Sequence, residues 1–474
     1  MPSELRASDL DAVRQQLGRE PSTSFSVWGR CTGGHPLVIR NASLDAEGRP
    51  FPTAYWLTCP EAVKAVARVE SAGWIARLNE RAQEDAAFAE GLAAAHRAYA
   101  EDRASDLAEA LGWGGVAGTR TGVKCLHAHY AYHLAGGDDP VGEWVASRVE
   151  PVHPEQLPGR VAAIDQGTNS IRLFVAEPLE GEGCGEIARD MVITRLGQGV
   201  DETGRIDPEA LARTVAVLAR YCRRARALGA ERIRVAATSA VRDASNRDDF
   251  ASAVREHAGS ELEVISGERE AGLSFLGGTF GLDDPDGGVP GAASPYLVLD
   301  IGGGSTELVV GSRAGHAEQA VSTQMGSVRL TERWIHHDPP STEDLEAVER
   351  EVDKVLEGVD PEAPALRDAR TLVAVAGTAT TLQAIALGLD RYDPDAIHRT
   401  WLTLPDIERI LGELAGMTNP ERAALPVMAP GRGDVIVAGA LILVGVMRRY
   451  RFERALVSET DILDGLAFEM LSIG

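Results

Sequence analysis

The segment YLVLDIGGGSTELVVG, residues 296–311, runs apolar residues into an aspartate, then three consecutive glycines, then apolar residues again. This pattern predicts a buried strand that delivers Asp300 to its end, where the chain must turn. Glycines permit φ > 0 and leave no side chain to block a ligand. Several consecutive backbone N–H groups can then point at one anion, so the turn is a candidate phosphate site.

An earlier segment, VAAIDQGTNSIRLFVA at residues 161–176, repeats this pattern around Asp165. The repetition indicates two related halves that face each other across a cleft. Two such hairpins would hold a phosphate chain from both sides, and their carboxylates would bind a divalent metal or orient water. The candidates for substrate phosphate are Asp165, Gly167, Thr168, Asn169 and Ser170 in the first loop and Gly302, Gly303, Gly304 and Ser305 in the second. The alternative is that the two segments are hairpins with small-residue turns and no ligand. This alternative accounts for either loop taken alone, whereas the pair of loops favours phosphate binding. A Walker-type loop is absent from the sequence.

Composition excludes several classes of protein. The 474 residues suggest about three domains. The net charge of −24 argues against binding to nucleic acid or an anionic membrane. Since there are only three lysines, a phosphate site must use arginine or backbone amides. Five cysteines and no secretory signal predict a cytoplasmic protein, and the apolar run at 435–447 predicts a buried helix because it is too short to span a bilayer.

The chain divides by pattern into an N-terminal domain at 1–150, a proline-rich linker at 151–160, and two halves at 161–293 and 294–474. The N-terminal domain opens with a helical pattern and two short strand-like pieces. A long alanine-rich helix over 61–111 follows, with interruptions expected near Gly73 and Gly91, and a further helix is expected within 122–137. From Val161 onward strands and helices alternate, which predicts α/β layers.

Seven motifs after Arg160 occur in an order that resembles the exopolyphosphatase and guanosine-pentaphosphate phosphatase family. They are AIDQGTNSIRLFVAE, AATSAVRDASNRDDF, VISGEREAGLSFLGGT, VLDIGGGSTELVVG, AVAGTATTLQAI, DVIVAGALIL and VSETDILDGLAFEM. The resemblance implies two ribonuclease-H-like halves of the actin-like ATPase superfamily around a cleft, in the family's short form. WLTCPEAV and GTRTGVKCLHAHYAYHLAGGDDPVG resemble domain-of-unknown-function family 501, so a small, mostly helical α+β domain is expected to precede the two halves.

The resemblance implies hydrolysis of the terminal phosphoanhydride of inorganic polyphosphate, with release of orthophosphate. Guanosine pentaphosphate or another nucleotide is the alternative substrate, and a non-catalytic phosphate or nucleotide sensor is a third reading. The family's catalytic glutamate matches Glu270 in SGEREAGL, with Glu268 as the second choice. Without the family, Glu270 is a solvated residue at a helix start. Arg269 and Gly272 depart from the family pattern, which leaves nearby substrate contacts uncertain.

Other site residues also follow from the resemblance. Arg242 matches a phosphate-contacting arginine, against the alternative of a surface ion pair with Asp243 or Asp248. Asp300 and Glu307 match carboxylates near a Mg²⁺ or Mn²⁺ ion and are expected to act in catalysis. Gly377 and Thr378 match a phosphate-binding turn or form a plain strand–helix turn. A homodimer and a link to the stringent response are also expected.

A structural Zn²⁺ ion in the N-terminal domain is a separate hypothesis. Cys125, His129 and His133 are spaced to share one face of a predicted helix. Cys31 and Cys59 elsewhere in the domain would complete a thiolate and imidazole set, whereas His127 lies off that face. The alternative is that all these residues are ordinary core or surface positions, since the sequence holds no Cys-x-x-Cys pair.

Overall fold

The computed structural model describes residues 7–31, 35–44, 49, 51, 53–104, 114–149, 159–179, 183–283 and 288–472. Contacts divide the chain into two compact units. The first unit comprises Met1–Ala162, Leu173–Asp190 and Val217–Ile233, and the second comprises Ala163–Arg172, Met191–Ala216 and Arg234–Gly474. The linker expected at 151–160 lies outside the described residues, apart from its last two positions.

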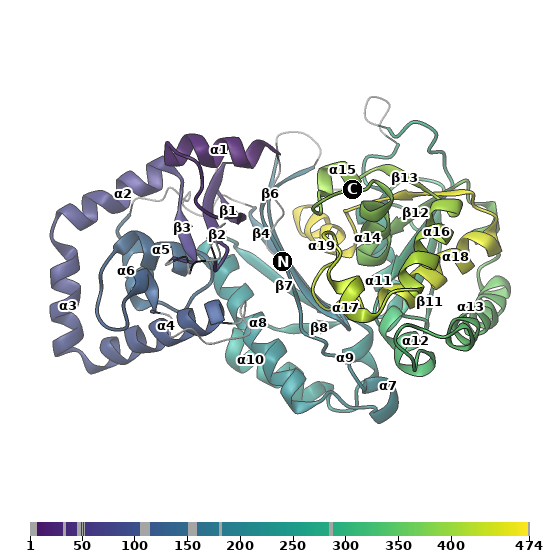
Figure 1. The fold of residues 1–474 in the computed structure, drawn as a ribbon, viewed down its shortest axis with the longest axis horizontal. Helices are drawn as coiled ribbons and strands as arrows, with labels where there is room; N and C mark the ends of the chain where they lie inside the picture. Colours follow the sequence, from purple (N-terminus) through teal and green to yellow (C-terminus); the bar gives the residue numbers. More distant parts are fainter. Residues whose placement is uncertain are drawn as a thin grey trace. The chain divides into compact units, whose positions relative to one another are not determined.

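The N-terminal part of the first unit combines a small antiparallel sheet with a set of helices (Figure 1). The sheet has the order β1-β2-β3, with β1 (Phe25–Arg30), β2 (Pro36–Asn41) and β3 (Tyr55–Leu57). The helices are α1 (Ala7–Leu17), α2 (Pro60–Ser71), α3 (Trp74–Glu84), α4 (Ala86–Ala104), the 3₁₀ helix η1 (Val116–Gly118), α5 (Leu126–Leu134) and α6 (Pro140–Ala146). The small α+β domain expected from the sequence is therefore confirmed.

The long alanine-rich helix is three helices, which Figure 1 shows as separate rods. The break at Gly73 is confirmed: this residue has φ of 82° and separates α2 from α3. The break at Gly91 is wrong, because Gly91 lies inside α4. The second interruption falls at Asp85, whose carboxylate accepts a hydrogen bond of 3.0 Å from the backbone N–H of Phe88. An aspartate in this position satisfies a free N–H at the start of α4, which explains why the chain turns there.

Aromatic side chains form the centre of the first unit. Tyr55 packs against Trp28, Tyr99 and Tyr132, with ring centroids 5.6, 6.0 and 5.7 Å apart. The guanidinium of Arg224 lies 4.7 Å from the Trp28 ring and is fully buried. Arg224 belongs to the last part of helix α8 (Pro208–Ala227), so this core also includes a segment that lies beyond the N-terminal domain in the sequence.

The two predicted halves have matching sheets. The first has the order β6-β5-β4-β7-β8, with β4 (Val161–Gln166), β5 (Ser170–Pro178), β6 (Cys184–Ile193), β7 (Arg232–Ala237) and β8 (Leu262–Val264). The second has the order β11-β10-β9-β12-β14-β13, with β9 (Tyr296–Ile301), β10 (Thr306–Gly311), β11 (Gln319–Thr323), β12 (Thr371–Val375), β13 (Thr400–Thr403) and β14 (Arg454–Val457). Each half therefore has an antiparallel hairpin strand pair beside its first strand and crossover strands on the other side, and β13 is an added edge strand in the second. This shared order confirms the internal repeat.

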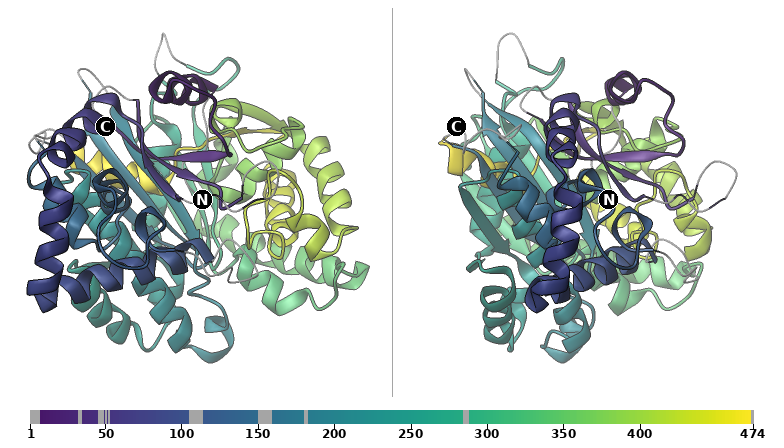
Figure 2. Two further views of the ribbon diagram at one scale, coloured as in Figure 1. Left: turned by 60° about the vertical axis from the view of Figure 1, so that its left-hand side comes forward. Right: turned by 90° about the vertical axis from the view of Figure 1, so that its left-hand side faces the viewer.

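Helices connect and cover these strands (Figure 2). Besides α8 they are α7 (Val200–Thr203), α9 (Ser239–Asp243), α10 (Arg247–Ala258), α11 (Gly267–Thr279), α12 (Ser327–Trp334), α13 (Thr342–Glu362), the 3₁₀ helix η2 (Pro364–Asp368), α14 (Ala376–Ala386), α15 (Pro394–Ile397), α16 (Leu404–Ala415), α17 (Asn419–Ala423), α18 (Ile436–Tyr450) and α19 (Ile462–Leu471). The apolar run at 435–447 forms α18, and its residues are almost all buried, as expected. No described helix combines the length and the apolarity that crossing a membrane requires.

Strand β9 separates two apolar layers. Leu297, Leu299 and Ile301 pack in one core with residues of α13, α14, α16 and α18. Tyr296 and Val298 pack in another with residues of α11. Because side chains alternate along a strand, Asp300 belongs to the α11 face. The sheet therefore presents this aspartate to the helix that begins with the GEREAG segment.

Helices α11 and α19 cross at glycines. A Cβ added at Gly277 would meet the carbonyl carbon of Asp461 at 2.7 Å, and one added at Gly465 would meet that of Leu273 at 2.9 Å. Both distances are shorter than packed atoms allow, so neither helix can carry a side chain at the crossing. This close approach matters because α11 carries Glu270 and Asp461 lies directly before α19.

We predict that Gly277→Ala destabilises the protein by about 1–3 kcal/mol, because the methyl group forces the two helices apart. Gly272→Ala is the matched control: it lies on the same helix, and its added Cβ would meet nothing within 4 Å. That control should be neutral or stabilise by up to about 1 kcal/mol through helix propensity. Denaturant unfolding measures both effects, and equal stabilities for the two variants would contradict the crossing.

Candidate functional site

The two predicted loops have the same backbone geometry. The N–H of Gly167 donates to the carbonyl of Ser170 at 2.9 Å, and the N–H of Gly302 donates to the carbonyl of Ser305 at 3.0 Å. The donor is two residues after the strand's aspartate in each case, and the acceptor five residues after it. The loops are thus equivalent turns. The expectation that glycine serves a positive φ is wrong, however, since none of Gly167, Gly302, Gly303 and Gly304 has one.

Close packing accounts for the glycines instead. A Cβ added at Gly303 would meet Cβ of Thr168 at 3.0 Å and Cγ2 of Val328 at 3.2 Å. One added at Gly304 would meet the hydroxyl of Thr168 at 2.8 Å. The first loop therefore rests directly on the second, and both belong to the second unit. The expected binding of a phosphate chain between the two loops stays a prediction. Thr168 is buried in this contact, whereas Gly167, Asn169 and Ser170 remain partly exposed.

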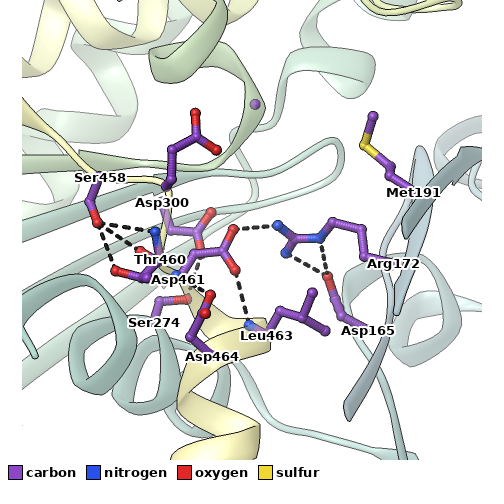
Figure 3. Close-up of polar contacts among 12 residues, drawn as sticks. Asp165, Arg172, Met191, Ser274, Asp300, Ser458, Thr460, Asp461, Leu463 and Asp464 are labelled. Atoms are coloured by element: carbon purple, nitrogen blue, oxygen red, sulfur yellow. Dashed lines mark hydrogen bonds and ion pairs between the residues drawn. The ribbon is translucent and has the colours of Figure 1, made fainter. Parts of the chain in front are cut away.

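The two hairpins differ in charge at one equivalent position. Seven residues after the aspartate, the first half has Arg172 and the second has Glu307. Figure 3 shows Arg172 between two carboxylates: it donates to Asp165 Oδ2 from Nη2 at 2.7 Å and from Nε at 3.1 Å, and it also pairs with Asp461. Asp165 is therefore held by an arginine, which makes it a support for Arg172 more than a direct phosphate ligand.

Asp461 accepts from the N–H of Leu463 at 3.0 Å, so it caps helix α19 as well as binding Arg172. Sequence reasoning missed both Arg172 and Asp461. Arg172 could have been found from the repeat, because it follows Asp165 by seven residues, as Glu307 follows Asp300. The signal for Asp461 was an aspartate that precedes an apolar helical run, which predicts a cap but no role at a site.

Asp300 and Glu307 form a pair across strands β9 and β10, where they are direct register partners. The hydroxyl of Ser274 donates to Asp300 Oδ2 at 2.5 Å, and that of Ser322 donates to Glu307 Oε1 at 2.8 Å. Among the described residues, Glu307 Oε2 has no hydrogen-bond partner although it is buried, and the same holds for Asp165 Oδ1. Buried carboxylate oxygens without partners are the atoms that a cation would satisfy.

Glu270 lies on the first turn of α11 and is buried, whereas the second choice, Glu268, is exposed. Arg242 Nη1 donates to Glu270 Oε2 at 3.1 Å and to the carbonyl of Ile265 at 3.0 Å. The alternative ion pair of Arg242 with Asp243 or Asp248 is wrong. In the structure Asp243 accepts from Arg329 at 2.8 Å, and Arg242 faces the site. Arg242 is thus a partner of Glu270.

The two departures from the family pattern lie outside this group of carboxylates. Arg269 points to the surface and pairs with Glu469. Gly272 has open space around it. Neither residue alters the surroundings of Glu270.

Burial and mutual repulsion raise the pKa of the carboxyl groups here. Burial raises the pKa of Glu270 to about 8, Arg242 opposes the shift, and Asp300 adds to it. Burial raises the pKa of Asp300 to about 6, with a contribution from Asp461. Burial, together with Glu270 and Asp300, raises the pKa of Glu307 as well. Shifts of this kind are typical of functional sites.

The predicted turn at Gly377 and Thr378 begins α14, directly after β12. Arg432 Nη1 donates to the carbonyl of Gly377 at 3.1 Å and to the hydroxyl of Thr381 at 2.8 Å. Thr378 is buried against Gly439 of α18. These contacts favour the strand–helix turn over a direct phosphate contact by Thr378.

The predicted zinc set is not assembled. His129 pairs with Asp139 at 2.7 Å inside the core, and Cys59 is hydrogen-bonded to Cys31. His133, near the end of the same helix, is partly exposed. In the described part of the chain, the one group of three metal-ligating side chains within 4.8 Å is Glu70, Cys125 and His127. The prediction that Cys125 shares a helix face with His129 and His133 is wrong, because Cys125 is the N-cap that precedes α5 and is not on the helix.

Comparisons with known proteins agree with this geometry. Residues 175–473 match the Ppx/GppA phosphatase family, and residues 27–147 match a protein family of unknown function, DUF501. The chain is 44% identical over 328 residues to exopolyphosphatase 2 of Mycobacterium tuberculosis, which covers 66% of this chain and 98% of the relative. It is 29% identical to exopolyphosphatase 1 of Mycobacterium leprae, over 66% of this chain and 89% of the relative.

Solved structures give the same result for the fold. An exopolyphosphatase-like protein aligns with a TM-score of 0.62 and 35% identity, over 66% of this chain and 99% of that one. The Aquifex aeolicus member of the Ppx/GppA family aligns with a TM-score of 0.56 and 30% identity, over 66% of this chain and 98% of that one. The chain therefore belongs to the Ppx/GppA phosphatase family, with the actin-like fold of that family and an additional N-terminal DUF501 domain.

Proposed function

We propose that this protein is an exopolyphosphatase, which removes the terminal phosphate of inorganic polyphosphate by hydrolysis. The observation that carries the proposal is the buried Glu270, oriented by Arg242 next to the Asp300–Glu307 pair. The relatives named exopolyphosphatase support polyphosphate as the substrate. The alignment with one of them covers 98% of that relative and 66% of this chain. A sensor without turnover is disfavoured, because a buried glutamate held by Arg242 supplies a base, which phosphate binding alone does not require.

In the proposed reaction Glu270 accepts the proton of the attacking water. Arg242 binds one oxygen of its carboxylate at 3.1 Å and so fixes the direction of the other. Burial raises the pKa of Glu270 to about 8, so the deprotonated carboxylate is a stronger base than that of an ordinary glutamate. The N–H groups of Gly303 and Gly304 would receive the phosphate chain, since that of Gly302 is bonded to the carbonyl of Ser305. These roles rely on positioning, which dominates phosphoryl transfer.

Two carboxylates of this site, Asp300 and Glu307, would supply oxygen ligands of the kind that a divalent cation takes from a protein. Glu307 Oε2 and Asp165 Oδ1 are buried without hydrogen-bond partners among the described residues, and oxygen donors suit Mg²⁺ or Mn²⁺. Asp300 and Glu307 would hold the ion. When bound, the ion neutralises charge on the phosphate oxygens. Asp165 and Asp461 are engaged with Arg172, which supplies a fixed positive charge next to these two carboxylates.

Selectivity between polyphosphate and guanosine pentaphosphate is open to a direct assay. Phosphate release is measured from polyphosphate of defined lengths beside guanosine pentaphosphate, with Mg²⁺ varied. Faster release from polyphosphate at equal concentration supports the proposal, and faster release from the nucleotide would replace it. The homodimer, the cytoplasmic location and the link to the stringent response remain predictions.

We expect Glu270→Gln to fold normally and to lose about 10²–10⁴-fold in kcat, because an amide cannot accept the proton of water. Glu268→Gln is the matched control, since Glu268 is exposed on the same helical turn. Steady-state phosphate release from polyphosphate compares the two. Near-normal turnover by Glu270→Gln, or equal losses in both variants, would remove Glu270 from the mechanism.

The raised pKa of Glu270 also predicts how stability depends on pH. Its ordinary value is 4.5 and its value in the folded protein is about 8. Between these values the folded protein binds a proton that the unfolded chain has lost. The free energy of unfolding should therefore fall as pH rises through this window, by at most about 1.4 kcal/mol per pH unit for this one proton.

Denaturant unfolding in a chelator from pH 5 to pH 8 measures this slope. Glu270→Gln should make the slope smaller, because the amide does not titrate while Asp300 and Glu307 still do, and Glu268→Gln should leave the slope unchanged. A slope that is the same in Glu270→Gln and in the wild type would show that the pH dependence comes from other groups.

A further inference from the structure

The N-terminal domain contains a group of ligands that the phosphatase site does not use. Glu70 lies near the end of α2, Cys125 is the N-cap of α5, and His127 is on the first turn of α5. One ligand atom from each lies within 4.8 Å of the other two. Glu70 Oε1 is 3.2 Å from His127 Nδ1, and Cys125 Sγ is 4.0 Å from the same nitrogen.

These separations suit a single metal ion. Zinc binds sulfur at about 2.3 Å and nitrogen or oxygen at about 2.0–2.2 Å, so the atoms around one tetrahedral zinc lie roughly 3.3–3.6 Å apart. The separations of 3.2 Å and 4.0 Å bracket this range. The atoms of Glu70 and Cys125 thus need only small shifts relative to His127 Nδ1 to share an ion with it. Glu70 Oε1 also accepts a hydrogen bond of 2.6 Å from the N–H of Leu126, which holds the carboxylate at this end of α5.

The histidine is oriented for this role. His127 Nε2 lies 3.0 Å from the carbonyl oxygen of Val63, which can only accept a hydrogen bond. Nε2 must therefore carry the proton, and the lone pair of a neutral ring is on Nδ1, the atom that faces Cys125 and Glu70. A backbone carbonyl that fixes the tautomer of a metal-binding histidine is a common feature of metal sites.

The same geometry argues against a catalytic Cys–His–Glu triad. In a triad the acid and the nucleophile occupy opposite nitrogens of the imidazole ring. Here both face Nδ1, and Nε2 is bound to the backbone. The lone pair on Nδ1 and the Glu70 carboxylate would repel each other unless a positive charge lay between them. Either a proton or a metal ion supplies that charge.

We propose that Glu70, Cys125 and His127 bind one Zn²⁺ ion in the DUF501 domain, with a water molecule as the fourth ligand. A thiolate with an imidazole favours zinc over the hard cations Mg²⁺ and Ca²⁺. The side chains of Glu70 and His127 are 25% and 24% exposed, so water reaches the group. Three protein ligands with one solvent position are the arrangement of zinc sites that interact with a further molecule.

The test uses the full-length protein, stripped with a chelator and then loaded with Zn²⁺ or Co²⁺ alone. After dialysis, elemental analysis should find one Zn²⁺ per chain more in the wild type than in Cys125→Ser. The Co²⁺ form should show a thiolate-to-cobalt charge-transfer band in the near ultraviolet. That band requires a sulfur ligand, so it separates this site from the carboxylates of the phosphatase site.

Cys125→Ser should abolish the band and weaken Zn²⁺ binding at least tenfold. Glu70→Gln and His127→Gln should each weaken binding similarly, and they carry the test if Cys125→Ser fails to fold. Cys184→Ser is the matched control and should change neither measurement. A wild-type protein that retains no zinc, as expected if Nδ1 carries a proton, would overturn the proposal. Retention of zinc and of the band in Cys125→Ser would overturn it too.

Discussion

The salt bridge of Arg172 with Asp165 and Asp461 is the interaction on which the second unit depends. Arg172 lies on a strand of the first half, and Asp461 begins the last helix of the second. The arginine therefore ties the two halves together within this unit. Burying two carboxylates without it would leave unpaired charges in the interior, which is strongly destabilising. Asp461 also caps α19, the helix that packs against α11 where glycines allow the two to touch.

An excess of negative charge follows from this arrangement. Arg172 and Arg242 balance part of the group, but Asp300 and Glu307 have no basic partner within hydrogen-bonding distance among the described residues. Their raised pKa values express the cost of burying these carboxylates and, in addition, of placing them near other negative charges. A cation and a phosphate chain would relieve that cost in the functional state. The two halves of the repeat thus differ in charge at the site, since Arg172 in the first half and Glu307 in the second occupy equivalent positions.

Much of this was predictable from the sequence, and particular residues show where prediction stopped. The aspartate–glycine repeat identified both hairpins, because strand ends and small-residue turns have local signatures. The sequence also indicated Glu270, through the order of motifs around it. Arg172 and Asp461 are 289 positions apart, and nothing local marks their pairing. The glycines of the second loop were expected for the wrong reason, since packing against Thr168, and not a positive φ, requires them. The predicted set of zinc ligands was wrong because it assumed helical spacing for Cys125, which lies just before the helix.

Binding of Mn²⁺ measured by titration calorimetry tests the charge balance most directly. The measurement uses the Cys125→Ser background, which removes the thiol of the N-terminal group from the result. The account predicts that Glu307→Gln binds Mn²⁺ at least tenfold more weakly while Glu268→Gln binds it as the parent does. Equal Mn²⁺ affinities for Glu307→Gln and the parent would show that the Asp300–Glu307 pair does not hold the cation, and would contradict the account.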